Sequence, residues 1–284
     1  MMYILLPVHN RKLITEKFVK CLKKQTLQDF TLVLIDDGSS DDTSFMVKSY
    51  LPCSIVIRGS GNLWWAGCLQ KGFEWLKRQK VNSSDICLII NDDVVINDDF
   101  LSIGHNILSR SPKTLLLAKS YDQKTGECRD CGVHVDWGKL SFSQADSQDL
   151  SNCFSTRGLF LKVIDFFHIG GFYPRQLPHY LSDYEFTTRA YNLGYYLRTD
   201  SSLTLLANFE TTGLHKIKPR DLRSFFHDYL SKRNASHPLY WIVFILLACP
   251  WRCKLKNVAR VIISSMKTIL SVLLKNCRRN SRGQ

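Results

Sequence analysis

The chain is short of acidic residues at one end and lacks a long apolar run near that end. Residues 213–284 hold 15 Lys and Arg but only 2 Asp and Glu. The apolar run 239–249 is 11 residues long, whereas crossing a bilayer takes about 20. The N-terminus leads almost directly into a short strand-like segment rather than a secretory signal, so we expect a cytoplasmic protein.

Patterns typical of zinc sites and nucleic-acid binding are also missing. Of ten cysteines, only Cys128 and Cys131 lie close together, and although His134 follows, nothing completes a set at zinc-ligand spacing. We therefore predict no zinc site. No recognised nucleic-acid motif is present, so nucleic acid is not an expected partner.

The positive charge is concentrated in the C-terminal part. The chain carries 38 basic and 25 acidic residues, which leaves 23 of each before residue 213. Residues 258–274 combine apolar side chains near helical spacing with interspersed Lys and Arg, a pattern typical of a helix lying in a membrane interface. We predict that this tail meets an anionic membrane surface. The alternative is a helical pair packed on the main domain, with its charges in water.

The first part of the chain alternates between strands and helices. Short apolar runs at 3–8, 30–35, 54–57 and 86–90 are separated by segments with helical spacing, which predicts an α/β fold with a mainly parallel central sheet and helices on both faces. Further on, we expect an antiparallel hairpin at 128–144 and a helix that Ser182 caps. We predict two parts: a domain at 1–212 and a basic helical tail at 213–284.

Acidic residues follow two of these strands. Asn91, Asp92 and Asp93 end the run 86–90, and Asp36 and Asp37 end the run 30–35. Ligands of open α/β sheets bind outside the carboxyl ends of the strands. Hard oxygen ligands there suit Mg²⁺ or Mn²⁺ together with a substrate diphosphate. The alternative is that Asp92 and Asp93 only cap a following helix.

Six short motifs follow one another along the chain: Pro7-Val8-His9-Asn10, Gln25-Thr26, Asp36-Asp37-Gly38-Ser39, Gly61-Asn62 with Ala66-Gly67, Asn91-Asp92-Asp93 and Asp183-Tyr184-Glu185. Their order resembles the family 2 glycosyltransferases with a GT-A fold, over residues 3 to about 215. The Trp64-Trp65 variant of the glycine loop is similar to bacterial members that form rhamnosyl or furanosyl linkages.

This resemblance implies a role for each matching residue. Asp183 stands at the position of the catalytic base. Asp93 is the expected ligand of Mg²⁺ or Mn²⁺, and His215 resembles a late histidine that joins the metal. The residues implied in nucleotide binding are Pro7, His9, Asp36, Asp37, Gly61, Asn62, Asn91 and Asp92. The residues expected on the acceptor side are Trp65, Arg157, Gly158 and Glu185.

The resemblance therefore implies a metal-dependent inverting glycosyltransferase. It would move a sugar from a UDP- or dTDP-sugar to a hydroxyl of a glycan or lipid-linked acceptor in cell-surface polysaccharide synthesis, at the inner face of the membrane. A nucleotidyltransferase would need a glycine-rich loop with Arg and Lys, which the start of this chain lacks. The other alternative is a non-catalytic sugar-nucleotide-binding protein of the same fold. The presence of both Asp93 and Asp183 argues against this alternative.

Overall fold

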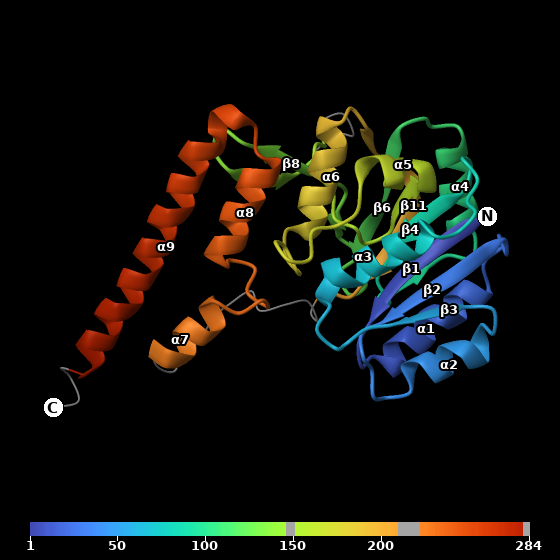
Figure 1. Ribbon diagram of the computed structural model, residues 1–284, viewed down its shortest axis with the longest axis horizontal. Helices are drawn as coiled ribbons and strands as arrows, with labels where there is room; N and C mark the ends of the chain where they lie inside the picture. The colour runs from blue at the N-terminus through green and yellow to red at the C-terminus, as the bar shows by residue number, and fades with distance from the viewer. Residues whose placement is uncertain (146–150, 210–221, 281–284) are drawn as a thin grey trace.

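The computed structural model describes residues 1–145, 151–209 and 222–280 (Figure 1). The elements in chain order are β1 (Met2–Val8), α1 (Lys12–Lys23), β2 (Phe30–Asp36), α2 (Thr43–Tyr50), β3 (Ile55–Arg58), α3 (Trp64–Leu76), β4 (Ile86–Ile89), β5 (Val94–Ile96), α4 (Phe100–Ser109), β6 (Thr114–Asp122), β7 (Cys128–Asp130), β8 (Val133–Asp136), β9 (Ser141–Gln144), β10 (Leu159–Lys162), α5 (Val163–Ile169), α6 (Ser182–Asn192), β11 (Tyr196–Ala207), α7 (Leu222–Tyr229), α8 (Pro238–Ala248) and α9 (Trp251–Asn280).

A central sheet has the strand order β3-β2-β1-β4-β10-β6-β11-β5, with β7 paired to β6. The first four strands are parallel, as predicted, and β6 and β11 are parallel to each other. Strand β10 runs antiparallel to both β4 and β6, and β5 runs antiparallel to β11. The sheet is therefore mixed in its second half. The predicted hairpin is formed by β8 and β9, which make a separate two-stranded sheet.

Helices cover both faces of the sheet, as the apolar runs predicted. Successive residues of β1 alternate between the two layers: Ile4 and Leu6 face the layer that holds Phe18 of α1, and Leu5 faces the layer that holds Phe73 of α3. All five side chains are buried. A strand covered on both faces has no polar side, which explains the uninterrupted apolar runs in the sequence.

The segment after Asp93 is not the helix that a capping role of Asp92 and Asp93 would require. It continues as strand β5, and helix α4 begins only at Phe100, after Asp99. The interpretation of Asp92 and Asp93 as caps of a following helix is therefore wrong. A three-residue strand such as β5 is too short to give a clear pattern in the sequence.

The C-terminal helices do not all behave alike. Phe244 and Ala248 of α8 share a buried cluster with Leu177 and Leu181, so the apolar run 239–249 packs on the main domain. Helix α9 runs beside α8 and projects away from the central sheet (Figure 1). The predicted boundary at 212/213 lies outside the described residues.

Helix α9 leaves most of its apolar side chains in solvent. Trp251 is 77% exposed and Leu255 is 86% exposed, and Ile262, Ile263 and Met266 are also exposed. By length and composition, the stretch Trp251–Leu274 is the one helix of the described residues that is long and apolar enough to cross a membrane. Packing on the main domain, the alternative for the tail, therefore holds for α8 and not for most of α9.

Candidate active site

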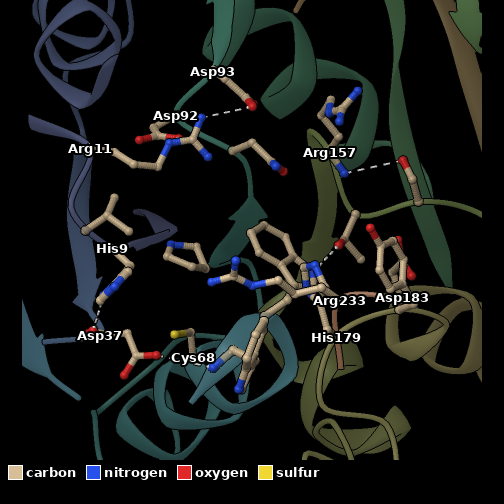
Figure 2. A pocket seen from close by; sticks show the side chains of 18 of the residues that line it. His9, Arg11, Asp37, Cys68, Asp92, Asp93, Arg157, His179, Asp183 and Arg233 are labelled. Carbon is tan, nitrogen blue, oxygen red and sulfur yellow. Dashed lines mark hydrogen bonds and ion pairs between the residues drawn. The ribbon is translucent and has the colours of Figure 1, made fainter. Parts of the chain in front are cut away.

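A cavity of about 790 Å³ lies at the carboxyl ends of β1 and β2 and extends to the start of α6. This volume is typical of a site for a small molecule or cofactor. Figure 2 shows two groups of charged side chains facing it, with Arg11, Asp92 and Asp93 on one side and Arg157 and Asp183 on another. Of the residues predicted for the site, the cavity is lined by Pro7, His9, Asp37, Gly61, Trp65, Asn91, Asp92, Asp93, Arg157 and Asp183.

Asp92 and Asp93 reach the cavity from the end of β4 and meet Arg11, which precedes α1. Arg11 Nη2 lies 3.1 Å from Asp93 Oδ2, and Arg11 Nε lies 3.3 Å from Asp92 Oδ1. Asp92 Oδ2 accepts a hydrogen bond of 2.7 Å from the Thr15 hydroxyl. Burial raises the pKa of Asp92 to about 6, against the opposing effect of Arg11. Both oxygens of Asp92 thus have partners within the protein.

Asp93 is the better candidate for a metal ligand. Its Oδ1 atom is buried and has no hydrogen-bond partner. Leaving a carboxylate oxygen buried and unpaired is costly, and a divalent cation would satisfy it. The described residues contain no cluster of three potential metal ligands. A Mg²⁺ ion held by one carboxylate together with substrate phosphates does not need one. His215, the other predicted ligand, lies outside the described residues.

Asp37 fixes the loop that opens α3. Its Oδ1 accepts a hydrogen bond from the Gly61 N–H at 2.7 Å, and its Oδ2 accepts one from the Leu63 N–H at 2.8 Å and one from the Trp64 N–H at 3.3 Å. The Nδ1 of His9 donates to the carbonyl oxygen of Asp37 at 2.6 Å. A carboxylate has about four acceptor positions, so Asp37 keeps capacity for a ligand. Its predicted contact with a pyrimidine base stays a prediction.

Four predicted site residues do not line the cavity. Asp36 is buried and accepts hydrogen bonds from the Ser39 N–H and the Ser44 hydroxyl, which hold the turn after β2. Asn62 accepts a hydrogen bond from the indole of Trp64. Gly158 has a φ of +83° and packs between strands, where a Cβ would meet Leu205 and Ala118.

Glu185 is the fourth of these residues, and the structure contradicts its predicted contact with the acceptor. It is 2% exposed and lies 2.8 Å from the Nε of Arg189, one turn further along α6. Arg189 also donates to the carbonyl oxygens of Ile169 and Gly171. Glu185 and Asp183 are two positions apart on one helix, so they cannot share a face. Glu185 therefore anchors α6 and does not line the cavity.

Asp183 lies at the start of α6 with its side chain toward the cavity (Figure 2). Its Oδ1 accepts a hydrogen bond of 3.0 Å from the Tyr184 N–H. Ser182, the predicted cap, donates instead to the carbonyl oxygen of His179, and the capping position belongs to Leu181 in a left-handed conformation. Burial raises the pKa of Asp183 to about 6. A carboxylate with such a pKa is a suitable general base near neutral pH.

Several residues of the cavity were missed in the sequence. Arg11, His179 and Tyr180 line it, as does Asp130, which lies inside the Cys128–Cys131 segment considered above only for zinc. Their partners are far away in the sequence, so no local pattern marks them. Cys128 and Cys131 are free.

Arg233 reaches the cavity from the segment between α7 and α8, inside the predicted tail. Its guanidinium lies 5.8 Å from the ring of Trp64, and the ammonium of Lys232 lies 5.9 Å from the same ring. Trp65 donates from its indole to the hydroxyl of Thr156 at 3.0 Å. The tail thus adds positive charge next to the tryptophan pair. Nothing in the composition of the tail separated this arginine from those facing solvent.

The fold and the cavity define a protein of the GT-A class. The mannosyltransferase PcManGT from Pyrobaculum calidifontis, solved with GDP-Man and Mn²⁺, is 12% identical, with a TM-score of 0.55 over 98% of this chain and 86% of its own. TarS from S. aureus is 20% identical, with a TM-score of 0.57 over 90% of this chain and 41% of its own. GalNAc-T7, solved with UDP, GalNAc and Mn²⁺, is 13% identical, with a TM-score of 0.60 over 78% of this chain and 45% of its own.

Residues 3–164 match the family described as glycosyl transferase family 2. The chain belongs to this family, as the order of its motifs predicted. It spans less than half the length of the TarS and GalNAc-T7 chains. Comparison with curated proteins gave no match.

Proposed function

We propose that the protein is a metal-dependent inverting glycosyltransferase that uses a UDP- or dTDP-sugar. Its acceptor is a hydroxyl of a glycan or lipid-linked saccharide in cell-surface polysaccharide synthesis. The observation that carries this proposal is that Asp93, with an unpaired buried oxygen, and Asp183, with a raised pKa, face one cavity of about 790 Å³ (Figure 2).

The residues divide the chemistry between them. A divalent cation at Asp93 would neutralise the charge of the leaving diphosphate. Asp183 takes the proton of the acceptor hydroxyl as that oxygen attacks the anomeric carbon. A single attack by a single oxygen inverts the configuration at this carbon. Arg233 supports the proposal because it adds a positive charge to the cavity where a diphosphate would need one.

The C-terminal tail supports a location of the enzyme at a membrane surface. The exposed apolar side chains of α9 occur together with Lys and Arg, which suits a helix at an anionic lipid surface on the cytoplasmic side. Such a position would bring the cavity close to a lipid-linked acceptor. The C-terminal part would thus contribute Arg233 to the cavity and also hold the enzyme at the membrane.

The test is a screen of UDP-, dTDP- and GDP-sugars with the full-length protein, with Mn²⁺ or Mg²⁺ and with EDTA. We expect metal-dependent binding of one nucleotide sugar and slow release of its nucleoside diphosphate in the absence of an acceptor. If no sugar nucleotide binds in the presence of either metal, the proposal is wrong. If one binds but is neither hydrolysed nor transferred, the non-catalytic alternative takes its place.

A further inference from the structure

Asp130 is a second carboxylate of the cavity, close enough to Asp183 for its charge to act on the pKa of Asp183, and the proposed function gives it no role. It is the last residue of β7 and lines the cavity. Its Oδ2 accepts a hydrogen bond of 2.5 Å from the Ser155 hydroxyl, and its Oδ1 accepts one of 3.3 Å from the Gly132 N–H. Since a carboxylate has about four acceptor positions, capacity for a ligand remains.

No side chain of the described residues forms an ion pair with Asp130. Burial raises the pKa of Asp130, and the charge of Arg157 lowers it without a direct contact. Asp130 is partly buried, and a carboxylate in such a place without a contacting cation is costly unless other groups donate hydrogen bonds to it. The protein supplies two such donors. A ligand rich in hydroxyl groups would supply the rest.

Asp130 and Asp183 are held in a fixed relation by the segment between them. Ser155, which binds Asp130, follows Phe154, whose N–H donates to the Thr187 hydroxyl at 2.9 Å. The same hydroxyl lies 2.9 Å from the carbonyl oxygen of Asp183, one turn earlier on α6. A site positioned by such supporting hydrogen bonds on regular elements is preorganised.

We propose that Asp130 and Asp183 together hold two hydroxyl groups of one acceptor sugar, so that the enzyme selects acceptors with a second hydroxyl near the reacting one. This rests on the proposed function. The attacking O–H bond breaks and its proton goes to Asp183, while the new bond to the anomeric carbon forms. The bond from that carbon to the diphosphate breaks, and its electron pair leaves with the nucleotide. Asp130 accepts a hydrogen bond from the second hydroxyl throughout and takes no proton.

The test uses the full-length enzyme with the donor found in the screen. The acceptor probes are octyl glycosides of glucose, galactose, mannose and rhamnose, together with the monodeoxy analogues of the one that is transferred. We expect Asp130→Asn to raise the KM for the acceptor by about 10- to 100-fold, because a hydrogen bond to a charged group is lost. The KM for the donor should change by less than about twofold, so that the effect of the substitution falls on the acceptor.

The deoxy analogues identify the partner of Asp130. With the wild-type enzyme, the KM for one analogue should exceed the KM for the parent glycoside by the factor that Asp130→Asn produces with the parent. Asp130→Asn should not raise the KM for this analogue any further, as in a double-mutant cycle. A purely structural role of Asp130 would not single out one hydroxyl. Asp136→Asn, a substitution in the neighbouring hairpin outside the cavity, is the matched control and should behave as wild type.

A pH profile gives an independent readout. Asp130 is one of the groups that raise the pKa of Asp183, while Arg157 lowers it and the Cys153 thiol and Tyr184 lie nearby. Removing the charge of Asp130 should therefore move the acidic limb of kcat to lower pH. If Asp130→Asn does not fold, Ser155→Ala takes its place and should raise the acceptor KM by a smaller factor, while the acidic limb of kcat stays in place because Asp130 keeps its charge.

Three results would overturn the inference. One is an unchanged acceptor KM in Asp130→Asn. Another is that Asp130→Asn raises the KM for every deoxy analogue by the same factor. The third is a wild-type enzyme that hydrolyses its donor but responds to none of the glycosides. Failure of the proposed function is distinct from all three, because the wild-type protein would then either bind no nucleotide sugar or bind one without hydrolysing or transferring it.

Discussion

Arg11 forms ion pairs with both carboxylates that follow β4, and it lies 3.1 Å from Asp93, a residue 82 positions away in the sequence. The guanidinium therefore neutralises two adjacent acids at the place where a divalent cation would bind. A divalent cation at Asp93, as proposed, would share this carboxylate with Arg11, so its affinity would depend on Arg11.

Replacing Arg11 with Met should tighten Mn²⁺ binding and lower the stability of the metal-free protein by about 1–3 kcal/mol, because it leaves two acidic groups without their cation. Added Mn²⁺ should raise the melting temperature more in the variant than in the wild type. Melting curves with EDTA and with Mn²⁺ measure both effects. Lys17→Met, on the exposed face of α1, is the matched control. Equal Mn²⁺ shifts in Arg11→Met and wild type would contradict this competition.

Replacing Asp183 with Asn should lower kcat by at least about 10²- to 10⁴-fold, the usual contribution of a general base. Affinity for the nucleotide sugar should be retained, because Asn keeps the size of the side chain. With the pKa of Asp183 raised to about 6, wild-type activity should fall as the pH drops below 6. Steady-state rates and donor titrations check this. Full transfer activity in the variant would exclude Asp183 as the base.

The same substitution should stabilise the fold at pH 8. Burial raises the pKa of Asp183 from 3.8 to about 6, so the folded state binds more protons than the unfolded state between these values. Stability therefore falls as the pH rises from about 4 to 6, by at most about 3 kcal/mol. Asp183→Asn removes this loss, so its gain in unfolding free energy should be present at pH 8 and absent at pH 4. Urea unfolding at both pH values provides the measurement, and a gain at pH 4 as large as at pH 8 would contradict it.

Replacing Arg233 with Gln should weaken donor binding by about 10-fold and make it less sensitive to salt, because a charge facing the cavity is lost. Arg223→Gln, on the exposed side of α7, is the control for loss of a tail charge alone. Titration of the nucleotide sugar at low and high salt compares the two variants. If they weaken binding equally, Arg233 acts only through the overall charge of the tail.

Replacing Ile262, Ile263 and Met266 together with Ser should release the protein from vesicles that contain anionic lipid. These side chains are exposed on α9, so the domain should remain folded and hydrolyse its donor as before. Vesicle flotation measures binding. Extraction of the wild-type protein by high salt would indicate a helix lying on the surface, whereas resistance to salt and alkali would indicate a helix that crosses the bilayer.

The sheet and half of the site were readable in the sequence because they depend on local order. Apolar runs mark buried strands, and Asp37 and Asp93 follow such runs directly. Arg11, Asp130 and Arg233 join the cavity through contacts between distant segments, which no local pattern contains. Glu185 was misassigned although its partner is local, because its ion pair with Arg189, one turn further along α6, turns it away from the cavity.

Helix α8 lies between the helix α6 that carries Asp183 and the exposed helix α9. It packs beside Tyr184, the neighbour of Asp183, while Asn257 at the start of α9 donates to the carbonyl oxygen of Trp137. With α9 on a lipid surface as proposed, these contacts would fix the height and tilt of the cavity above the bilayer. The enzyme would then select acceptors whose sugar projects from the lipid surface as far as the cavity is held above it.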